Sequence, residues 1–235
     1  MLTKANEAVA AVRGAVGGHA GKLALGILGP VSGEFLPATL KRFSQTYPNI
    51  DVFLKEIALD EQIVQLETKK IQIAFIFNQA GDPAIPHLEH YVVFERDPIV
   101  LLSRLHPLAA KKSIKITELA GDTVLCLADN GVLGQHERSV REIFQKHSLK
   151  PAKIKQMNSF VSMYAFMISN LGVTLGPKLH NVPPPLGVVE RPIEVNKNDP
   201  KYQLRAVWLK NETSAPVKNF IDTLKLETSL QVEPT

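Results

Sequence analysis

The sequence predicts an α/β protein built on parallel sheets, and three observations carry this prediction. Short apolar runs alternate with segments whose apolar residues recur at helical spacing, over most of the 235 residues. Residues 71–77 are almost continuously apolar, as expected for a strand covered on both faces. Residues 158–177 are typical of a strand end, a capped helix, a glycine turn and a short buried strand. This alternation favours parallel strands with right-handed crossovers.

The first half of the chain is predicted to form a β-α-β-α-β series followed by two further strands. The strands are expected at 23–28, 50–57, 71–77, 88–94 and 98–103, and the helices at 34–46 and 62–69. The first helix places Leu36, Leu40, Phe43 and Tyr47 on one face. The charged break Glu95-Arg96-Asp97-Pro98 interrupts one extended run, which suits a crossing of the chain between two lobes.

The second half repeats the α/β rhythm. Strands are expected at 123–128, 153–157, 173–175, 188–195 and 203–209, and helices at 135–147, 160–171 and 216–226. Ser159 is the expected N-cap of the middle helix, and Gly172 is expected to supply the left-handed residue at its end. On the helix 135–147, Val140, Ile143 and Phe144 are expected inward, whereas Glu137, Arg138, Arg141 and Glu142 are expected to form a solvated face.

Composition limits the partners. The 27 basic and 23 acidic residues give a net charge of +4, and the basic residues are scattered, so this chain is not expected to bind nucleic acid by itself. The single cysteine excludes an intrachain disulfide and a cysteine-based metal cage, which suits a reducing compartment. The apolar N-terminal stretch is interrupted by Glu7 and Arg13, unlike a signal peptide. We therefore expect a cytoplasmic protein.

Several motifs that could carry catalysis or metal binding are weak in this chain. The glycines from Gly26 to Gly33 have neither of the spacings that cradle phosphates. His87 and His90 precede or begin a strand, where residues three apart face opposite ways. No G-x-S-x-G elbow frames a nucleophile. Cys126 lies in an apolar strand and is expected to be a buried structural thiol. We expect no catalytic residue, metal ion or cofactor, and therefore no enzyme.

Six segments together suggest a family. They are Gly21-Lys22-Leu23-Ala24-Leu25-Gly26, Phe35-Leu36-Pro37 with Tyr47-Pro48, Ile71-Gln72-Ile73-Ala74, His106-Pro107-Leu108-Ala109, residues 158–177, and Glu190-Arg191-Pro192-Ile193. In order and spacing this set, which covers about residues 20–226, resembles the effector-binding domain of LysR-type transcriptional regulators. Gln72 stands where that family usually has aspartate.

The resemblance implies two Rossmann-like lobes joined by two crossing strands, in the manner of type 2 periplasmic binding proteins. Residues 20–95 with 210–235 would form regulatory lobe I, and residues 96–209 would form regulatory lobe II. Residues 1–19 would be the end of a linker helix and a hinge, since 4–16 carry an apolar stripe that ends in glycines. An ordinary helix docked on its own domain explains that stripe equally well. The family's N-terminal winged helix-turn-helix is not in this sequence.

The resemblance also places an effector between the lobes, at loops that follow the strands. The candidate contacts are Pro30, Val31, Ser32, Leu59, Phe77, Asn78, Ala128, Asn130, Ser159 and Phe160. Relatives that bind small carboxylates often carry hydroxyl side chains after the first two strands, whereas this chain has Pro30 and Leu59. A buried carboxylate without donors costs several kcal/mol, so we expect a rather apolar or aromatic effector. Two alternatives stay open: a register shift by one or two residues, and a cleft that holds no ligand.

The expected function is therefore ligand sensing and oligomerisation in a LysR-type regulator. The expected partners are a small-molecule effector and further copies of the chain, as a homodimer or homotetramer. Helices 34–46 and 135–147 are the candidates for that contact. Operator DNA would be reached only through the N-terminal domain, and no membrane is involved. The alternatives are an extracytoplasmic solute-binding protein and an enzyme on the same scaffold.

Overall fold

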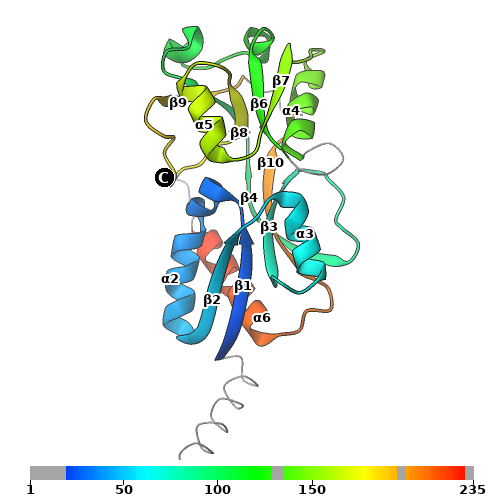
Figure 1. Cartoon of the computed structure of the whole chain (residues 1–235). Helices are drawn as coiled ribbons and strands as arrows, with labels where there is room; N and C mark the ends of the chain where they lie inside the picture. Colours follow the sequence, from blue (N-terminus) through cyan, green and yellow to red (C-terminus); the bar gives the residue numbers. More distant parts are fainter. Residues whose placement is uncertain (1–19, 129–134, 195–198, 231–235) are drawn as a thin grey trace, which may run out of the picture. The chain divides into compact units, whose positions relative to one another are not determined.

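The computed structural model describes residues 20–128, 135–194 and 199–230, which form two compact units (Figure 1). Unit 1 contains the chain up to Ile76, then Ala84–Val93 and the residues from Arg205 onward. Unit 2 contains Phe77–Pro83 and Phe94–Leu204. Three of the four passages between the units therefore fall inside strands, and the fourth falls in a loop.

The largest sheet has five strands in the order β2-β1-β3-β10-β4. These strands are β1 (Ala20–Ile27), β2 (Asn49–Glu56), β3 (Ile73–Gln79), β4 (Leu88–Arg96) and β10 (Tyr202–Leu209). β1 pairs in parallel with both β2 and β3, which confirms the parallel arrangement predicted for the first three strands. Residues of β3 up to Ile76 are buried without a break, as their continuous apolar sequence predicts.

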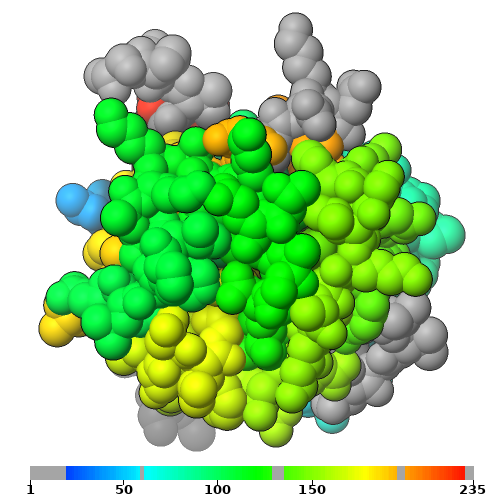
Figure 2. Space-filling model, turned by 90° about the horizontal axis from the view of Figure 1, so that it is seen from above, coloured from blue at the N-terminus to red at the C-terminus, as the bar shows by residue number. Residues whose placement is uncertain are grey.

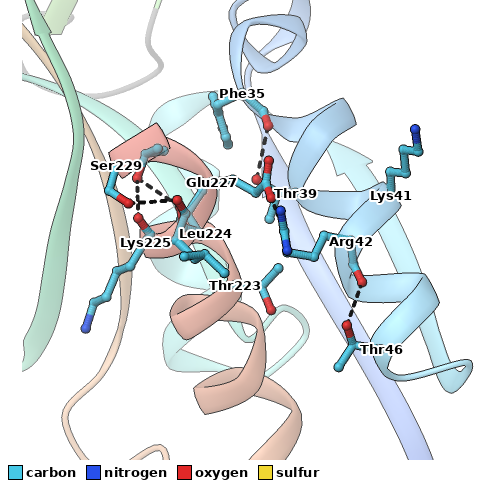
Figure 3. A network of polar contacts seen from close by, with 12 residues as sticks. Phe35, Thr39, Lys41, Arg42, Thr46, Thr223, Leu224, Lys225, Glu227 and Ser229 are labelled. Atoms are coloured by element: carbon cyan, nitrogen blue, oxygen red, sulfur yellow. Dashed lines mark hydrogen bonds and ion pairs between the residues drawn. The ribbon is translucent and has the colours of Figure 1, made fainter. Parts of the chain in front are cut away.

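Two helices of unit 1 lie side by side, as Figure 1 shows: α2 (Leu36–Thr46) and α6 (Ala215–Leu230). Their contact buries Phe43 against Phe220, whose rings are 5.2 Å apart and nearly perpendicular. The Arg42 guanidinium forms an ion pair with the Glu227 carboxylate across the same contact (Figure 3). The sequence predicted the apolar face of α2 that contains Phe43, through the spacing of its residues, but not the helix that covers it. α3 (Leu59–Glu67) and the short 3-10 helix η1 (Gly29–Glu34) complete unit 1.

Unit 2 mixes parallel and antiparallel pairing. β5 (Pro98–Ser103) lies between β8 (Thr174–Pro177) and β9 (Val188–Pro192) and is antiparallel to both. β6 (Thr123–Leu127) and β7 (Lys153–Met157) form a separate parallel pair. A parallel bridge from Val124 to Val173 joins β6 to the segment that leads into β8. The strand positions agree with the sequence prediction, whereas the antiparallel pairing of β5 differs from the parallel rhythm expected there.

The two helices of unit 2 cover opposite faces of β6. Val124 and Cys126 pack with α4 (Gln135–Lys146), whereas Leu125 and Leu127 pack with α5 (Phe160–Ile168). This division follows from the alternation of side chains along a strand. The 3-10 helices η2 (Pro107–Ala110) and η3 (Ile116–Leu119) belong to the green segment in Figure 2, beside the lighter green segment that carries α4 and β7.

Two of the segments that suggested a family bond to each other. The Arg191 guanidinium donates to the Ala109 carbonyl from Nε at 3.0 Å and from Nη2 at 2.5 Å, so β9 holds the turn at η2. His106 caps that turn, because its Nδ1 accepts the Leu108 N–H at 3.2 Å. Two segments that are far apart in the sequence are therefore held together within unit 2.

Two predictions about single residues are wrong. Glu137 does not belong to a solvated face, because it is buried and accepts hydrogen bonds from Arg141 and Gln156. The left-handed residue after α5 is Asn170, with φ of 56°, and not Gly172. Gly172 is needed for a different reason: a Cβ there would lie 2.7 Å from the Thr123 carbonyl oxygen. The predicted helix 4–16 lies outside the described residues.

Candidate functional site

In unit 1, one buried amide side chain links the carboxyl ends of β1 and β2 to the backbone of β3. Gln62 of α3 has no exposed surface, and its Nε2 donates to the carbonyls of Ile57, at 3.1 Å, and Ile27. Its Oε1 accepts the Phe75 N–H at 3.1 Å. These bonds fix the carboxyl ends of β1 and β2 next to β3, so the loops that follow start from a rigid frame. This role was not predictable from the sequence, because a glutamine in an amphipathic helix is usually exposed.

The loop after β1 contains three of the candidate contacts. Pro30, Val31 and Ser32 lie in η1, where Val31 and Ser32 are buried and Pro30 is half-buried. The Ser32 hydroxyl accepts the Leu28 N–H at 3.2 Å and faces the Leu28 carbonyl at 3.4 Å. It therefore closes its own turn, and η1 offers a mainly apolar surface. Leu59 begins α3, and its side chain lies outside the described part of the structure.

Phe77 and Asn78 lie near the end of β3, within unit 2. The half-buried Phe77 ring stands 6.3 Å from the rings of Phe94 and Tyr202. Asn78 is 8% exposed, and its Oδ1 has no hydrogen-bond partner among the described residues. An unpaired buried amide oxygen costs about 1–3 kcal/mol, which a donor from a bound molecule or from water would recover. Asn78 is therefore the strongest polar anchor among the candidates.

Three of the remaining candidates gather at the carboxyl ends of β6 and β7. Ala128 follows β6 and donates its N–H to the Met157 carbonyl at 2.8 Å. Ser159 caps α5 as predicted, since its Oγ accepts the Ser162 N–H at 3.2 Å. Phe160 begins α5, with its ring 6.2 Å from that of Tyr164. Asn130 lies outside the described residues. Unit 2 thus brings Ala128, Ser159 and Phe160 to one edge of its parallel strand pair.

His136 was not predicted to have a role, yet it joins three elements. Its Nδ1 accepts the Leu127 N–H at 3.0 Å, and its Nε2 lies 2.8 Å from the Leu175 carbonyl oxygen. These partners require a neutral ring with its proton on Nε2. Burial lowers the pKa of His136, and the hydrogen bond to Leu175 opposes that effect. The side chain therefore fixes the start of α4 against β6 and β8.

The Glu137 carboxylate of α4 and the Cys126 thiol of β6 have structural roles. The Glu137 pKa is lowered, mainly by the hydrogen bond from Gln156 and then by that from Arg141. Burial raises the pKa of Cys126 to about 12, and the charge on Glu137 adds to this effect. The thiol is fully buried, in agreement with the prediction of a structural cysteine. A thiol held in this form is a poor nucleophile and a poor metal ligand.

Residues 20–128, 135–194 and 199–230 contain neither a candidate membrane-spanning helix nor a candidate metal cluster. None of the helices in these ranges has the length and apolar character needed to span a bilayer. In the same ranges, His, Cys, Asp and Glu side chains nowhere gather in a group of three suited to a metal ion.

Comparison with known proteins gives consistent matches. The family model described as LysR substrate binding domain matches residues 17–228. The HTH-type transcriptional regulator AlsR of Bacillus subtilis is 24% identical over 214 residues, which cover 87% of this chain and 66% of AlsR. Across the curated relatives, the matched part is between half and two thirds of the relative's length.

Solved structures share the fold. The BenM effector binding domain with its effector benzoate superposes with a TM-score of 0.72 at 18% identity, over 91% of this chain and 95% of that one. The effector binding domain of QuiR in complex with shikimate gives 0.74 at 20% identity, over 89% and 98% respectively. The two-lobed effector-domain fold that the resemblance implied is therefore confirmed.

Proposed function

This chain belongs to the LysR substrate-binding domain family, and from that premise we propose that it senses a small effector within a longer DNA-binding transcriptional regulator. The match over residues 17–228 carries this proposal. Curated relatives are named as transcriptional regulators, which supports a sensor over an enzyme or a solute-binding protein. Operator DNA is contacted through an N-terminal domain of the longer protein, and the protein works in the cytoplasm.

We assign the effector to an apolar or aromatic class. Pro30 and Leu59 follow the first two strands, where relatives that bind small carboxylates tend to carry hydroxyls, and the aromatic ring of Phe77 lies near the end of the third strand. The hydroxyls of Ser32 and Ser159 are already bonded within their own turns. Related domains were solved with benzoate in one case and shikimate in another, so family likeness alone leaves the class open. The side chains of this chain favour the aromatic choice.

Asn78 adds a polar requirement to this effector. Its buried Oδ1 is satisfied best by a hydroxyl or N–H group of the ligand. A site that buries such an acceptor discriminates strongly against ligands that lack the donor. We therefore propose a ring-bearing effector with one donor group that reaches Asn78.

Calorimetric titration with benzoate, 4-hydroxybenzoate and succinate tests this proposal. We expect 4-hydroxybenzoate to bind more tightly than benzoate, and Asn78→Leu to reduce only that preference, by about tenfold. Benzoate serves as the matched control, because it lacks the donor and should bind both proteins within about twofold. Binding of succinate without binding of either aromatic acid would contradict the assignment.

Subunit pairing completes the proposal. We assign it to the helices α2 and α4 of two copies of the chain, in a homodimer or a homotetramer. Arg42 of α2 is half exposed, and its partner Glu227 of α6 is largely buried. The ion pair therefore fixes the position of one positive charge on the surface of α2. A ligand that binds one pairing geometry more tightly than another would shift the equilibrium between them. Sedimentation with and without the effector measures that shift.

A further inference from the structure

Side chains in the first turn of α4 bond to neighbouring strands and to the loop that follows β3. His136 contacts the backbone of β6 and β8, and Glu137 accepts a hydrogen bond from Gln156 of β7 at 3.1 Å. Gln135 and Arg138 bond instead to the loop that follows β3. Four consecutive residues of α4 thus bond to β6, β7, β8 and the loop that follows β3, all within unit 2.

The link from α4 to β3 runs through Asp82. Its Oδ2 accepts from the Gln79 N–H at 2.9 Å, from Gln135 Nε2 at 3.2 Å and from Arg138 Nη2 at 2.7 Å. The Asp82 side chain is 17% exposed, so this ion pair is better shielded from solvent than a pair on an open surface. One carboxylate oxygen therefore holds the last residue of β3 and the first turn of α4 together.

A second link runs beside the first. Gln79 is buried, and its Nε2 donates to the Ser139 carbonyl in the second turn of α4 at 3.4 Å. Gln79 is also the residue next to Asn78, the buried amide with the unpaired oxygen. A displacement of the strand end at Asn78 therefore reaches α4 by two hydrogen-bonded routes, both within unit 2.

We propose that Asp82 and Gln79 are positioning residues that couple the end of β3 to the first two turns of α4. The inference rests on the proposed function, in which the strand end contacts the effector and α4 takes part in subunit pairing. Occupancy at Asn78 then changes the geometry of the helix that a second subunit contacts. The coupling is the free energy by which a change at the end of β3 alters the stability of the first two turns of α4, through the hydrogen bonds that join them.

Amide hydrogen exchange on the full chain tests the link from the loop side. Asp82→Asn keeps the side-chain shape and removes the charge that holds Arg138. Exchange in the first two turns of α4 and at the Gln79 amide should rise together, by about tenfold. Glu142→Gln is the matched control, since Glu142 also approaches Arg138, at 3.8 Å, but is more exposed and lies on α4 itself. It should change exchange by less than about twofold. Arg138→Gln gives a second break of the same pair from the helix side.

A double-mutant cycle tests the coupling itself. Asn78→Leu should alter exchange in α4 by roughly threefold when Asp82 is present. The factor should be smaller when Asp82→Asn or Arg138→Gln is also present, because only the bond from Gln79 to the Ser139 carbonyl then links the strand to the helix. Equal effects of Asn78→Leu in all backgrounds would overturn the proposal, as would an Asp82→Asn effect no larger than that of Glu142→Gln. No effector is used, so a chain that binds no small molecule would defeat the proposed function and leave this coupling standing.

Discussion

At the scale of single residues, buried amides and one imidazole do most of the organising. Gln62 and His136 each bond to backbone groups of several strands, and neither belongs to a recognisable motif. Asn78 is the exception, because its oxygen has no partner among the described residues. The Gln62 amide therefore stabilises the arrangement of the strands, whereas the Asn78 amide oxygen is available to a ligand.

Gln62→Leu should lower the free energy of unfolding by about 2–4 kcal/mol. The change leaves the Phe75 N–H and two carbonyls without their buried partner, and each unsatisfied group costs about 1–3 kcal/mol. Gln65→Leu, one turn away, is the control, because Gln65 Nε2 bonds only the exposed Glu61 carboxylate. It should cost no more than about 0.5 kcal/mol in the same urea titration. Equal costs for the two substitutions would refute the role assigned to Gln62.

The residues most accessible to sequence reasoning were those whose role depends on local spacing. Ser159 as an N-cap and Cys126 as a buried thiol are confirmed. The reason predicted for Gly172 is wrong. The Thr123 carbonyl leaves no room for a side chain at this position, and Thr123 is far away in the sequence. Local patterns carry no information about such a contact.

At the scale of elements, strand and helix positions followed closely from apolar periodicity. The described strands and helices coincide with the predicted ranges to within a few residues. The pairing of β5 with β8 and β9 did not follow, since periodicity does not distinguish parallel from antiparallel neighbours. The buried polar side of α4 was also missed, because Glu137 appears solvated until its partners Arg141 and Gln156 are known.

The attachment of α4 should depend on pH through His136. Its pKa in the folded protein lies below the value of about 6.5 expected in an unfolded chain. As pH falls below about 6.5, the unfolded chain binds a proton that the folded protein does not, so stability decreases towards the folded-state pKa. The full contribution of the neutral ring is present above about pH 6.5.

Urea unfolding at pH 8, 6.5 and 5.5 measures this effect. The wild-type free energy of unfolding should fall on acidification, by at most about 1.4 kcal/mol per pH unit from this group. In His136→Gln, stability should be lower at pH 8 and should change less with pH. An unchanged slope in the variant would show that another group is responsible.

At the scale of the whole molecule, the two units share strands. β3, β4 and β10 each run through a boundary between unit 1 and unit 2. The sequence assigns all of 20–95 to one lobe, whereas the compact units of the structure group Phe77–Pro83 with unit 2. Residues 73–77 are all apolar, so no change in pattern marks where a strand leaves one core for the other.

Shared strands predict cooperative unfolding. Loss of either unit would break β3, β4 and β10, so thermal unfolding of the chain should give a single transition. The calorimetric and van't Hoff enthalpies should then agree within about 10%. Two separated transitions would mean that each core holds its part of these strands independently.

The order of the chain also sets a delay during synthesis. Unit 1 needs α6, whose Phe220 covers Phe43, yet Phe94–Leu204 must leave the ribosome before α6 appears. At ~5–20 residues per second this takes about 5 to 20 s. For that time the nascent β1 and α2 carry uncovered apolar faces, which makes the half-made polypeptide a natural client for chaperones.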